Sequence, residues 1–74
     1  MNSVLLEVLK RTITDDESKL VPSAKLIDDL GCDSLSAMEI VMELEDKLAI
    51  KVDDAEIEKI ITIQDIINIV EAKQ

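Results

Sequence analysis

The 74-residue chain lacks histidine and aromatic residues altogether, and it has one glycine, one proline and one cysteine. Without histidine, a serine or cysteine has no base of the usual kind to activate it, which disfavours nucleophilic catalysis. A single cysteine excludes an internal disulfide framework and is typical of a reducing compartment. Without aromatic residues, the core must consist of aliphatic side chains and methionine. The length predicts one small domain over residues 1–74.

Long hydrophobic runs are also missing from the chain. No apolar stretch approaches the length needed to span a bilayer, and the N-terminus has no basic segment followed by an apolar run. We therefore expect a monomer in the cytoplasm, without stable membrane insertion.

Basic residues are scarce, and eight of them against seventeen acidic residues give a formal net charge of −9. The segment 28–58 holds eleven acidic and two basic residues, so it carries the whole net charge. This balance disfavours nucleic acid and anionic membranes as partners and favours basic protein surfaces. A solvated acidic face that keeps a small protein soluble explains the same charge without any partner.

The spacing of apolar residues predicts an all-α fold, a small four-helix bundle with a long first loop and a short third helix. Ser3 is a suitable N-cap for the first helix. The inward residues of this helix are Val4, Leu5, Val8, Leu9 and Ile13. A loop over residues 14–24, anchored by Leu20 and Val21, follows it. The only glycine, Gly31, suits a stop with positive φ after a short turn.

The second half of the chain predicts three helices. The first of them covers about residues 34–48, and Asp53 or Asp54 caps the next, which is short. Thr62 with Asp65 resembles a capping box that opens the last helix. The short helix bears Ile57 and Ile60. The inward residues of the last helix are Ile63, Ile66, Ile67 and Val70. Residues 50–52 alternate like a strand but have no partner strand, so we expect a loop there.

The helix over residues 34–48 has two apolar stripes on nearly opposite sides. One stripe suits a core: Ala37, Ile40, Val41, Leu44 and Leu48. The other is flanked by Glu39, Glu45 and Asp46 and consists of Leu35, Met38, Met42 and Ala49. A helix in a two-layer bundle needs only one buried stripe. The second is either additional core beneath the long loop or an apolar docking surface rimmed by charge.

Ser34 lies where the Gly31 turn opens into this helix. Asp33 and Ser34 are both preferred N-cap residues, so a purely structural role is one explanation. With no base at hand, Ser34 is better suited to being modified than to attacking a substrate. Cys32 has no cation near it in sequence and is expected to be a small buried hydrophobe. The acidic residues lack the spacing of a calcium loop, so no metal site is predicted, and weak binding of divalent cations stays open.

The combination Leu30-Gly31-Cys32-Asp33-Ser34-Leu35 with the acidic helix Glu39–Glu45 resembles the acyl carrier protein family, and the likeness covers essentially the whole chain. The resemblance implies that a phosphopantetheinyl transferase attaches 4′-phosphopantetheine to Ser34, between Asp33 and Leu35. The thiol of this arm would carry acyl groups as thioesters, so the protein itself would not be an enzyme. The resemblance also implies residues that dock acyl-processing enzymes with basic surfaces: Leu35, Met38, Glu39, Met42, Glu45, Asp46 and Glu56.

Four positions depart from the usual pattern of bacterial fatty-acid carriers, namely Cys32, Ser36, Leu48 and Asp53. They leave the modification site intact, but Ser36 removes an acid from the docking end of the helix. Fatty-acid biosynthesis is the expected pathway. Because Ser36 weakens that expectation, a specialised carrier for polyketide, lipid A or another secondary pathway is the alternative. A third hypothesis is a small acidic adaptor in which Ser34 is only a helix cap.

Overall fold

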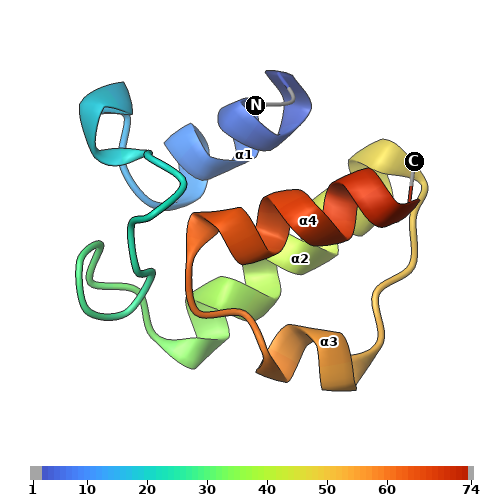
Figure 1. Cartoon of the computed structure of the whole chain (residues 1–74). Coiled ribbons are helices and arrows are strands. Elements are labelled where there is room, and N and C mark those ends of the chain that lie inside the picture. Colours follow the sequence, from blue (N-terminus) through green and yellow to red (C-terminus); the bar gives the residue numbers. More distant parts are fainter. Residues whose placement is uncertain (1–2, 74) are drawn as a thin grey trace.

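The structure, a computed structural model, describes residues 3–73. Over these residues the protein has four α-helices and no strand, which confirms the predicted all-α fold (Figure 1). The elements are α1 Ser3–Thr12, a 3₁₀ turn Glu17–Lys19, α2 Ser34–Leu48, α3 Asp54–Glu58 and α4 Ile63–Lys73. None of the helices described is long and apolar enough to cross a membrane.

The beginning of α2 follows from its capping residues. The Asp33 carboxylate accepts a hydrogen bond from the backbone N–H of Ser36 at 2.8 Å, so Asp33 is the N-cap and Ser34 lies in the first turn. Just before it, Gly31 has φ +70°, the left-handed conformation that the sequence predicted for the only glycine. The helix ends at Ala49, which also adopts a left-handed conformation, with φ 54°.

Side-chain carboxylates also cap the two later helices. The Glu56 carboxylate accepts a hydrogen bond from the backbone N–H of Asp53, the residue before α3, at 3.0 Å. Asp65 accepts from the backbone N–H groups of Ile61 and Thr62 at 2.8 and 2.9 Å, and the Thr62 hydroxyl accepts in return from Asp65 N–H. The capping box predicted at Thr62 and Asp65 is therefore confirmed.

The core is aliphatic, and three of the helices contribute to it. In Figure 1, α4 lies in front of α2, α1 lies above them, and α3 lies at the lower edge. Side chains from α1, α2, α4 and the long loop form one buried cluster, whose largest fully buried members are Leu5, Leu9, Leu26, Ile40, Leu44, Ile63 and Ile66. This packing holds α2 in place and leaves its opposite side facing solvent.

Two predictions about the first half of the chain are wrong. Ser3 is the first residue of α1 rather than the cap before it. Leu20 anchors the long loop as expected and is 5% exposed, but Val21 is 44% exposed. A loop has no period, so the sequence does not distinguish which of two adjacent apolar residues points inward.

The long loop is fastened to the connection between α3 and α4 by backbone hydrogen bonds. Leu26 N–H donates to the Ile61 carbonyl at 2.9 Å, and Ile63 N–H donates to the Ala24 carbonyl at 3.1 Å. An isolated antiparallel bridge joins Lys25 to Thr62. These contacts fix the segment that leads to Ser34 relative to α3 and α4.

Candidate functional site

Ser34 is an exposed side chain at the N-terminus of α2. Since Asp33 already serves as the cap, the Ser34 hydroxyl is not needed to satisfy the backbone of the first turn. Over residues 3–73 the hydroxyl forms no hydrogen bond with another side chain or with the backbone. Hydrogen bonding by Ser36, chiefly through its backbone N–H, lowers the pKa of Asp33. The site therefore holds a free hydroxyl beside a firmly ionised carboxylate.

An apolar cleft of about 340 Å³ opens directly beside Ser34, and we call it the Ser34 cleft. Its walls come from α2, from α3 with the residues after it, and from the loop before Gly31. The apolar residues that line it are Leu26, Ile27, Ala37, Met38, Ile57 and Ile60. Ser34 and Glu58 are the two polar residues of the lining. A cleft of this size and composition suits a small aliphatic group.

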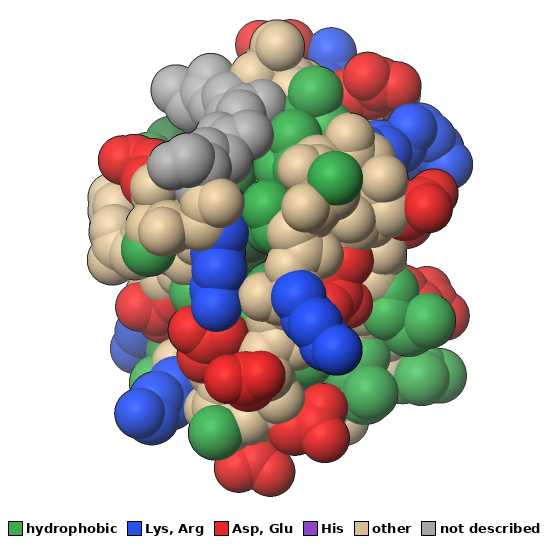
Figure 2. Space-filling model, turned by 90° about the vertical axis from the view of Figure 1, so that its right-hand side faces the viewer, with side chains coloured by type: hydrophobic (Ala, Val, Ile, Leu, Met, Phe, Trp, Pro, Cys, Tyr) green, Lys and Arg blue, Asp and Glu red, His purple; other side chains and the backbone are tan. Residues whose placement is uncertain are grey.

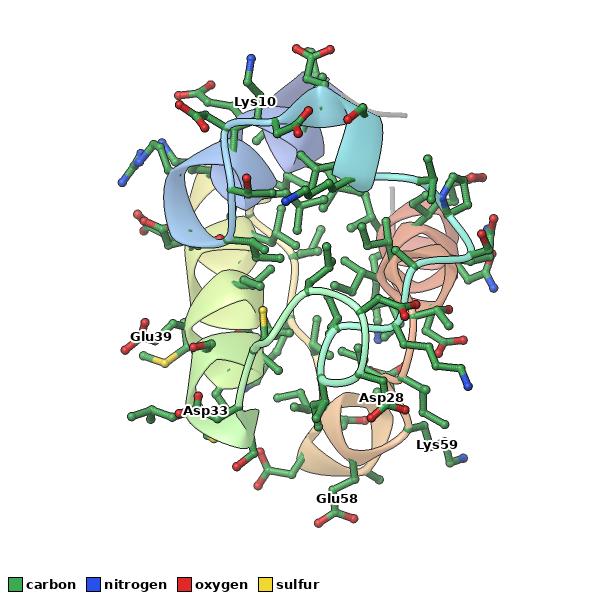
Figure 3. All side chains as sticks on the ribbon, turned by 90° about the vertical axis from the view of Figure 1, so that its left-hand side faces the viewer. Lys10, Asp28, Asp33, Glu39, Glu58 and Lys59 are labelled. Atoms are coloured by element: carbon green, nitrogen blue, oxygen red, sulfur yellow. The ribbon has the colours of Figure 1, made fainter. Side chains whose placement is uncertain are left out.

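Acidic side chains surround this end of the molecule. Figure 3 shows Asp33 at the start of α2, Asp28 on the loop and Glu58 on α3, all where these three elements meet. Lys59 lies farther round the same end, and Lys10 lies at the opposite end, on α1. None of the basic residues within 3–73 lines the Ser34 cleft. The local field therefore favours a positively charged surface on whatever approaches Ser34.

Cys32 is buried, with 8% of its surface exposed, and belongs to the core cluster. Burial, assisted by the negative charge of Asp33, raises the pKa of its thiol. A thiol that is buried and protonated is a poor nucleophile. Cys32 thus lies in the place expected of a small hydrophobic residue.

The two stripes of α2 divide as the sequence suggested. Ile40, Val41 and Leu44 of the first stripe are buried. The second stripe faces solvent, since Leu35 is 63%, Met38 45% and Met42 62% exposed. These exposures exclude the hypothesis that the second stripe is additional core. Figure 2 shows hydrophobic side chains gathered at the lower right of one face, beside acidic ones.

The acidic residues predicted to dock partners fall into two groups. Glu39 and Asp46 are exposed on α2, and Figure 3 shows Glu39 pointing away from the bundle. Glu45 is partly buried, and its carboxylate accepts a hydrogen bond from Val52 N–H at 3.0 Å. Glu56 caps α3 and also forms an ion pair with Lys73 at 3.1 Å. The capping bond from Asp53 and the Lys73 contact lower the pKa of Glu56. The last two carboxylates therefore have partners within the chain.

The predicted site residues do not all come together. Ser34 and Met38 both line the cleft, Glu39 and Asp46 are exposed elsewhere on α2, and Glu56 faces α4 through Lys73. Sequence reasoning missed Ile27 and Ile57 as residues lining the space beside Ser34. The adjacent pair Leu26-Ile27 was an available signal, because two large aliphatic residues in a polar loop require a reason.

No group of three or more potential metal ligands occurs within residues 3–73. The acidic residues around Ser34 project from separate elements. They form an electrostatic surface rather than a chelating cluster.

Comparison with known proteins defines the class first. Residues 3–70 match the family model described as a phosphopantetheine attachment site, so the chain is a phosphopantetheine-dependent carrier. It resembles an acyl carrier protein from Thermotoga maritima, with 44% identity over 71 residues that cover 96% of this chain and 88% of the relative. A relative of the same name from Campylobacter concisus is 38% identical over 88% of this chain and 84% of its own.

A solved structure agrees with these sequence matches. The crystal structure of an acyl carrier protein from Thermotoga maritima superimposes with a TM-score of 0.79 at 30% identity, over 93% of this chain and 80% of that chain. The chain therefore belongs to the acyl carrier protein family. It is a carrier rather than an enzyme, and its cofactor is 4′-phosphopantetheine.

Proposed function

We propose that Ser34 is the residue that bears the phosphopantetheine arm, with Asp33 and Leu35 flanking the attachment point. The observation that carries this proposal is that Asp33, and not Ser34, is the N-cap of α2. Asp33 caps the helix through Ser36, which leaves the exposed Ser34 hydroxyl free beside an apolar cleft. An adaptor in which Ser34 is the helix cap does not account for that arrangement.

The residues present fit the arm. A phosphodiester on the Ser34 oxygen lies near the positive end of the α2 dipole, which favours a negative charge there. The neighbouring cleft is mainly apolar, so it suits the carbon chain of an acyl group better than it suits water. When bound, the arm supplies a terminal thiol that carries acyl groups as thioesters.

Attachment requires a second protein, because the chain offers no histidine to remove the serine proton. The Ser34 oxygen forms the new bond to the phosphorus of the pantetheine phosphate. The pyrophosphate bond of coenzyme A breaks, the adenosine bisphosphate part leaves, and a base of the transferase takes the hydroxyl proton. This division of labour makes Ser34 a substrate of the phosphopantetheinyl transferase.

The exposed stripe of α2 serves, in this proposal, as the docking surface for the transferase and for acyl-processing enzymes with basic surfaces. Leu35, Met38 and Met42 supply its apolar contact area, and Glu39 and Asp46 supply its charge. Glu45 contributes less than the sequence suggested, because Val52 already occupies one of its carboxylate oxygens.

Fatty-acid biosynthesis is the pathway we propose, in the cytoplasm and with the carrier as a monomer. Support comes from relatives named acyl carrier protein and from the acidic docking helix. The first turn of α2 has Ser36 where bacterial fatty-acid carriers often have an acid, and this feature favours the alternative of a specialised carrier.

Intact-mass measurement tests the attachment site. The apoprotein is incubated with coenzyme A and a broad-specificity phosphopantetheinyl transferase, and one added phosphopantetheine is expected. Ser34→Ala abolishes the addition, and Ser36→Ala, two residues away on the same helix, retains it. Modification of Ser36, or no modification of the wild-type protein, contradicts the proposal and favours the adaptor.

A second reaction tests the pathway. The loaded carrier is incubated with a fatty-acid malonyl transferase and malonyl-coenzyme A, and a malonyl thioester is expected in the mass spectrum. A loaded carrier that this enzyme leaves unchanged belongs to a specialised pathway.

A further inference from the structure

The exposed large apolar side chains of the described residues are not confined to α2. Six are present, and Ile27 of the loop is 61% exposed, as much as Leu35 or Met42. Only two of the six also line the Ser34 cleft, namely Met38 and Ile27. Met38 comes from α2, and Ile27 comes from the loop on the other side of the cleft. An apolar surface therefore continues from the α2 stripe across the mouth of the cleft.

The loop that carries Ile27 is held in one conformation. Its neighbour Leu26 is 1% exposed in the core, and Leu26 N–H donates to the Ile61 carbonyl at 2.9 Å. The Leu26 carbonyl accepts from Cys32 N–H at 2.9 Å. The Asp29 carboxylate accepts from Lys25 N–H at 2.8 Å. These bonds fix the backbone on both sides of Ile27, so its side chain is presented to solvent by a prearranged turn, and little entropy is lost when a partner covers it.

The charges around this surface are mainly negative. Asp28 follows Ile27 directly, Asp33 precedes Ser34, and Glu58 lines the cleft (Figure 3). Over residues 25–33 the chain has one base, Lys25, against three acids. A partner that covers Ile27 must therefore match an apolar centre with a basic rim, the same chemistry that suits the exposed stripe of α2.

We infer that Ile27 is a docking anchor, and that a partner protein with an apolar centre and a basic rim binds astride the mouth of the Ser34 cleft. Such a partner contacts Met38 on α2 and Ile27 on the loop at the same time. This inference rests on the proposed function, because it concerns the approach of partners to the arm on Ser34. The sequence placed the predicted docking residues on α2, except for Glu56 on α3. The inference adds the loop that carries Ile27 to this docking surface.

The test uses the full-length apoprotein and a broad-specificity phosphopantetheinyl transferase with coenzyme A. Ile61 is the matched control, since it is an isoleucine of equal exposure, 62%, that does not line the Ser34 cleft. Ile27→Ala is expected to lower kcat/KM about tenfold, mainly through KM, as for a central apolar contact. Ile61→Ala is expected to change it less than about twofold, and Ile27→Met, which retains apolar area, is expected to restore most of the loss.

A second pair of variants covers the case in which Ile27→Ala lowers the melting temperature. Ile27→Lys keeps a long side chain and places a cation against a basic partner, and Ile61→Lys is its control. The first is expected to lower kcat/KM more than the second, and high salt is expected to narrow the difference because it screens the repulsion.

The outcomes separate the inference from the proposed function. If the wild-type protein is not modified at Ser34, the proposed function is wrong and the inference fails with it. If Ser34 is modified normally but the Ile27 and Ile61 variants lose equal activity, or none, the docking surface does not include the loop, and the proposed function stands.

Discussion

The Glu45 carboxylate accepts a hydrogen bond from the backbone N–H of Val52 at 3.0 Å and so ties α2 to the segment that leads into α3. Val52 is a core residue, with 8% of its surface exposed. An unsatisfied N–H at such a place is costly, because water reaches it poorly. A residue that the sequence assigned to partner docking therefore has a structural task as well.

Removal of this acceptor is expected to cost stability. We predict that Glu45→Ala lowers the free energy of unfolding by about 1 kcal/mol, and that Glu45→Gln, which keeps an acceptor oxygen, lowers it much less. Glu39→Ala is the matched control, since Glu39 is exposed on the same helix and should leave stability unchanged. Denaturant titration of the three variants measures the differences. Equal stability of Glu45→Ala and Glu39→Ala would show that the Val52 bond contributes nothing.

Charge reversal gives the complementary result at Glu39. Glu39→Lys is expected to slow association with the transferase and to weaken the salt dependence of that rate, because long-range attraction acts mainly on encounter. Stopped-flow measurement at several salt concentrations tests this. An association rate equal to that of the wild type at low salt contradicts the assignment of Glu39 to the docking surface.

The sequence predicted the helices well where local chemistry decides them. Asp33 with Ser36, and Thr62 with Asp65, are capping arrangements within four residues of each other, so their spacing alone indicates where α2 and α4 begin. The buried stripe of α2 was also predictable, because a 3.6-residue period places its members on one side.

The remaining features depend on contacts between distant parts of the chain. The outward direction of Ile27 follows from the bond between Leu26 and Ile61, thirty-five positions apart, and no local pattern encodes it. The partner of Glu56 on α4, Lys73, is likewise remote in sequence. The Ser34 cleft itself is the space left between three elements, so its lining could not be listed before those elements were placed.

The C-terminus of α2 offers a stabilising substitution. Ala49 has φ 54°, where a Cβ atom is unfavourable and glycine is preferred. Ala49→Gly is expected to raise the free energy of unfolding by about 0.5–1 kcal/mol. Ala55→Gly, in the right-handed conformation of α3, is the control and should lower it, since glycine is a poor helix former. Thermal melting of both variants tests the prediction, and the same sign for both would contradict it.

Salt is expected to stabilise the protein. The acidic segment 28–58 repels itself at neutral pH. Its two ion pairs within residues 3–73, Glu43 with Arg11 at 2.9 Å and Glu56 with Lys73 at 3.1 Å, are partly exposed and contribute little. Salt therefore weakens the repulsion among the acids more than it weakens the attraction within the ion pairs. The melting temperature should rise with sodium chloride or with a divalent cation at neutral pH. A melting temperature that ignores both additions shows that the acids are too far apart to interact.

Acid is expected to act in two stages. Mild acidification towards about pH 5 reduces the net charge and should raise the melting temperature slightly. Hydrogen bonding lowers the pKa values of the capping carboxylates Asp33 and Asp65 below their ordinary value of 3.8, chiefly through backbone N–H groups. A group whose pKa is lower in the folded state stabilises the fold above its unfolded pKa and loses that effect as the pH falls through the folded value. The melting temperature should therefore fall below about pH 4.

The cap variant Asp33→Asn isolates the second stage. Asparagine keeps an N-cap oxygen without a titrating carboxyl, so the variant should lose less stability than the wild type between about pH 4 and pH 2. Parallel melting curves at each pH provide the measurement. If the melting temperatures of the two proteins fall equally as the pH is lowered, the Asp33 cap does not contribute to acid unfolding.

The two sides of α2 should respond differently to the same truncation. Leu44 is 2% exposed in the core, so Leu44→Ala leaves a cavity and is expected to cost roughly 2–5 kcal/mol of stability. Met42 is 62% exposed, so Met42→Ala should leave the melting temperature nearly unchanged. Met42→Ala should instead weaken the binding of the transferase by about 1–2 kcal/mol, as for a central contact, through faster dissociation. Both variants are measured by thermal melting and by transferase kinetics per folded molecule. If Met42→Ala melts as low as Leu44→Ala while turnover is unchanged, Met42 supports the core and the docking surface does not include it.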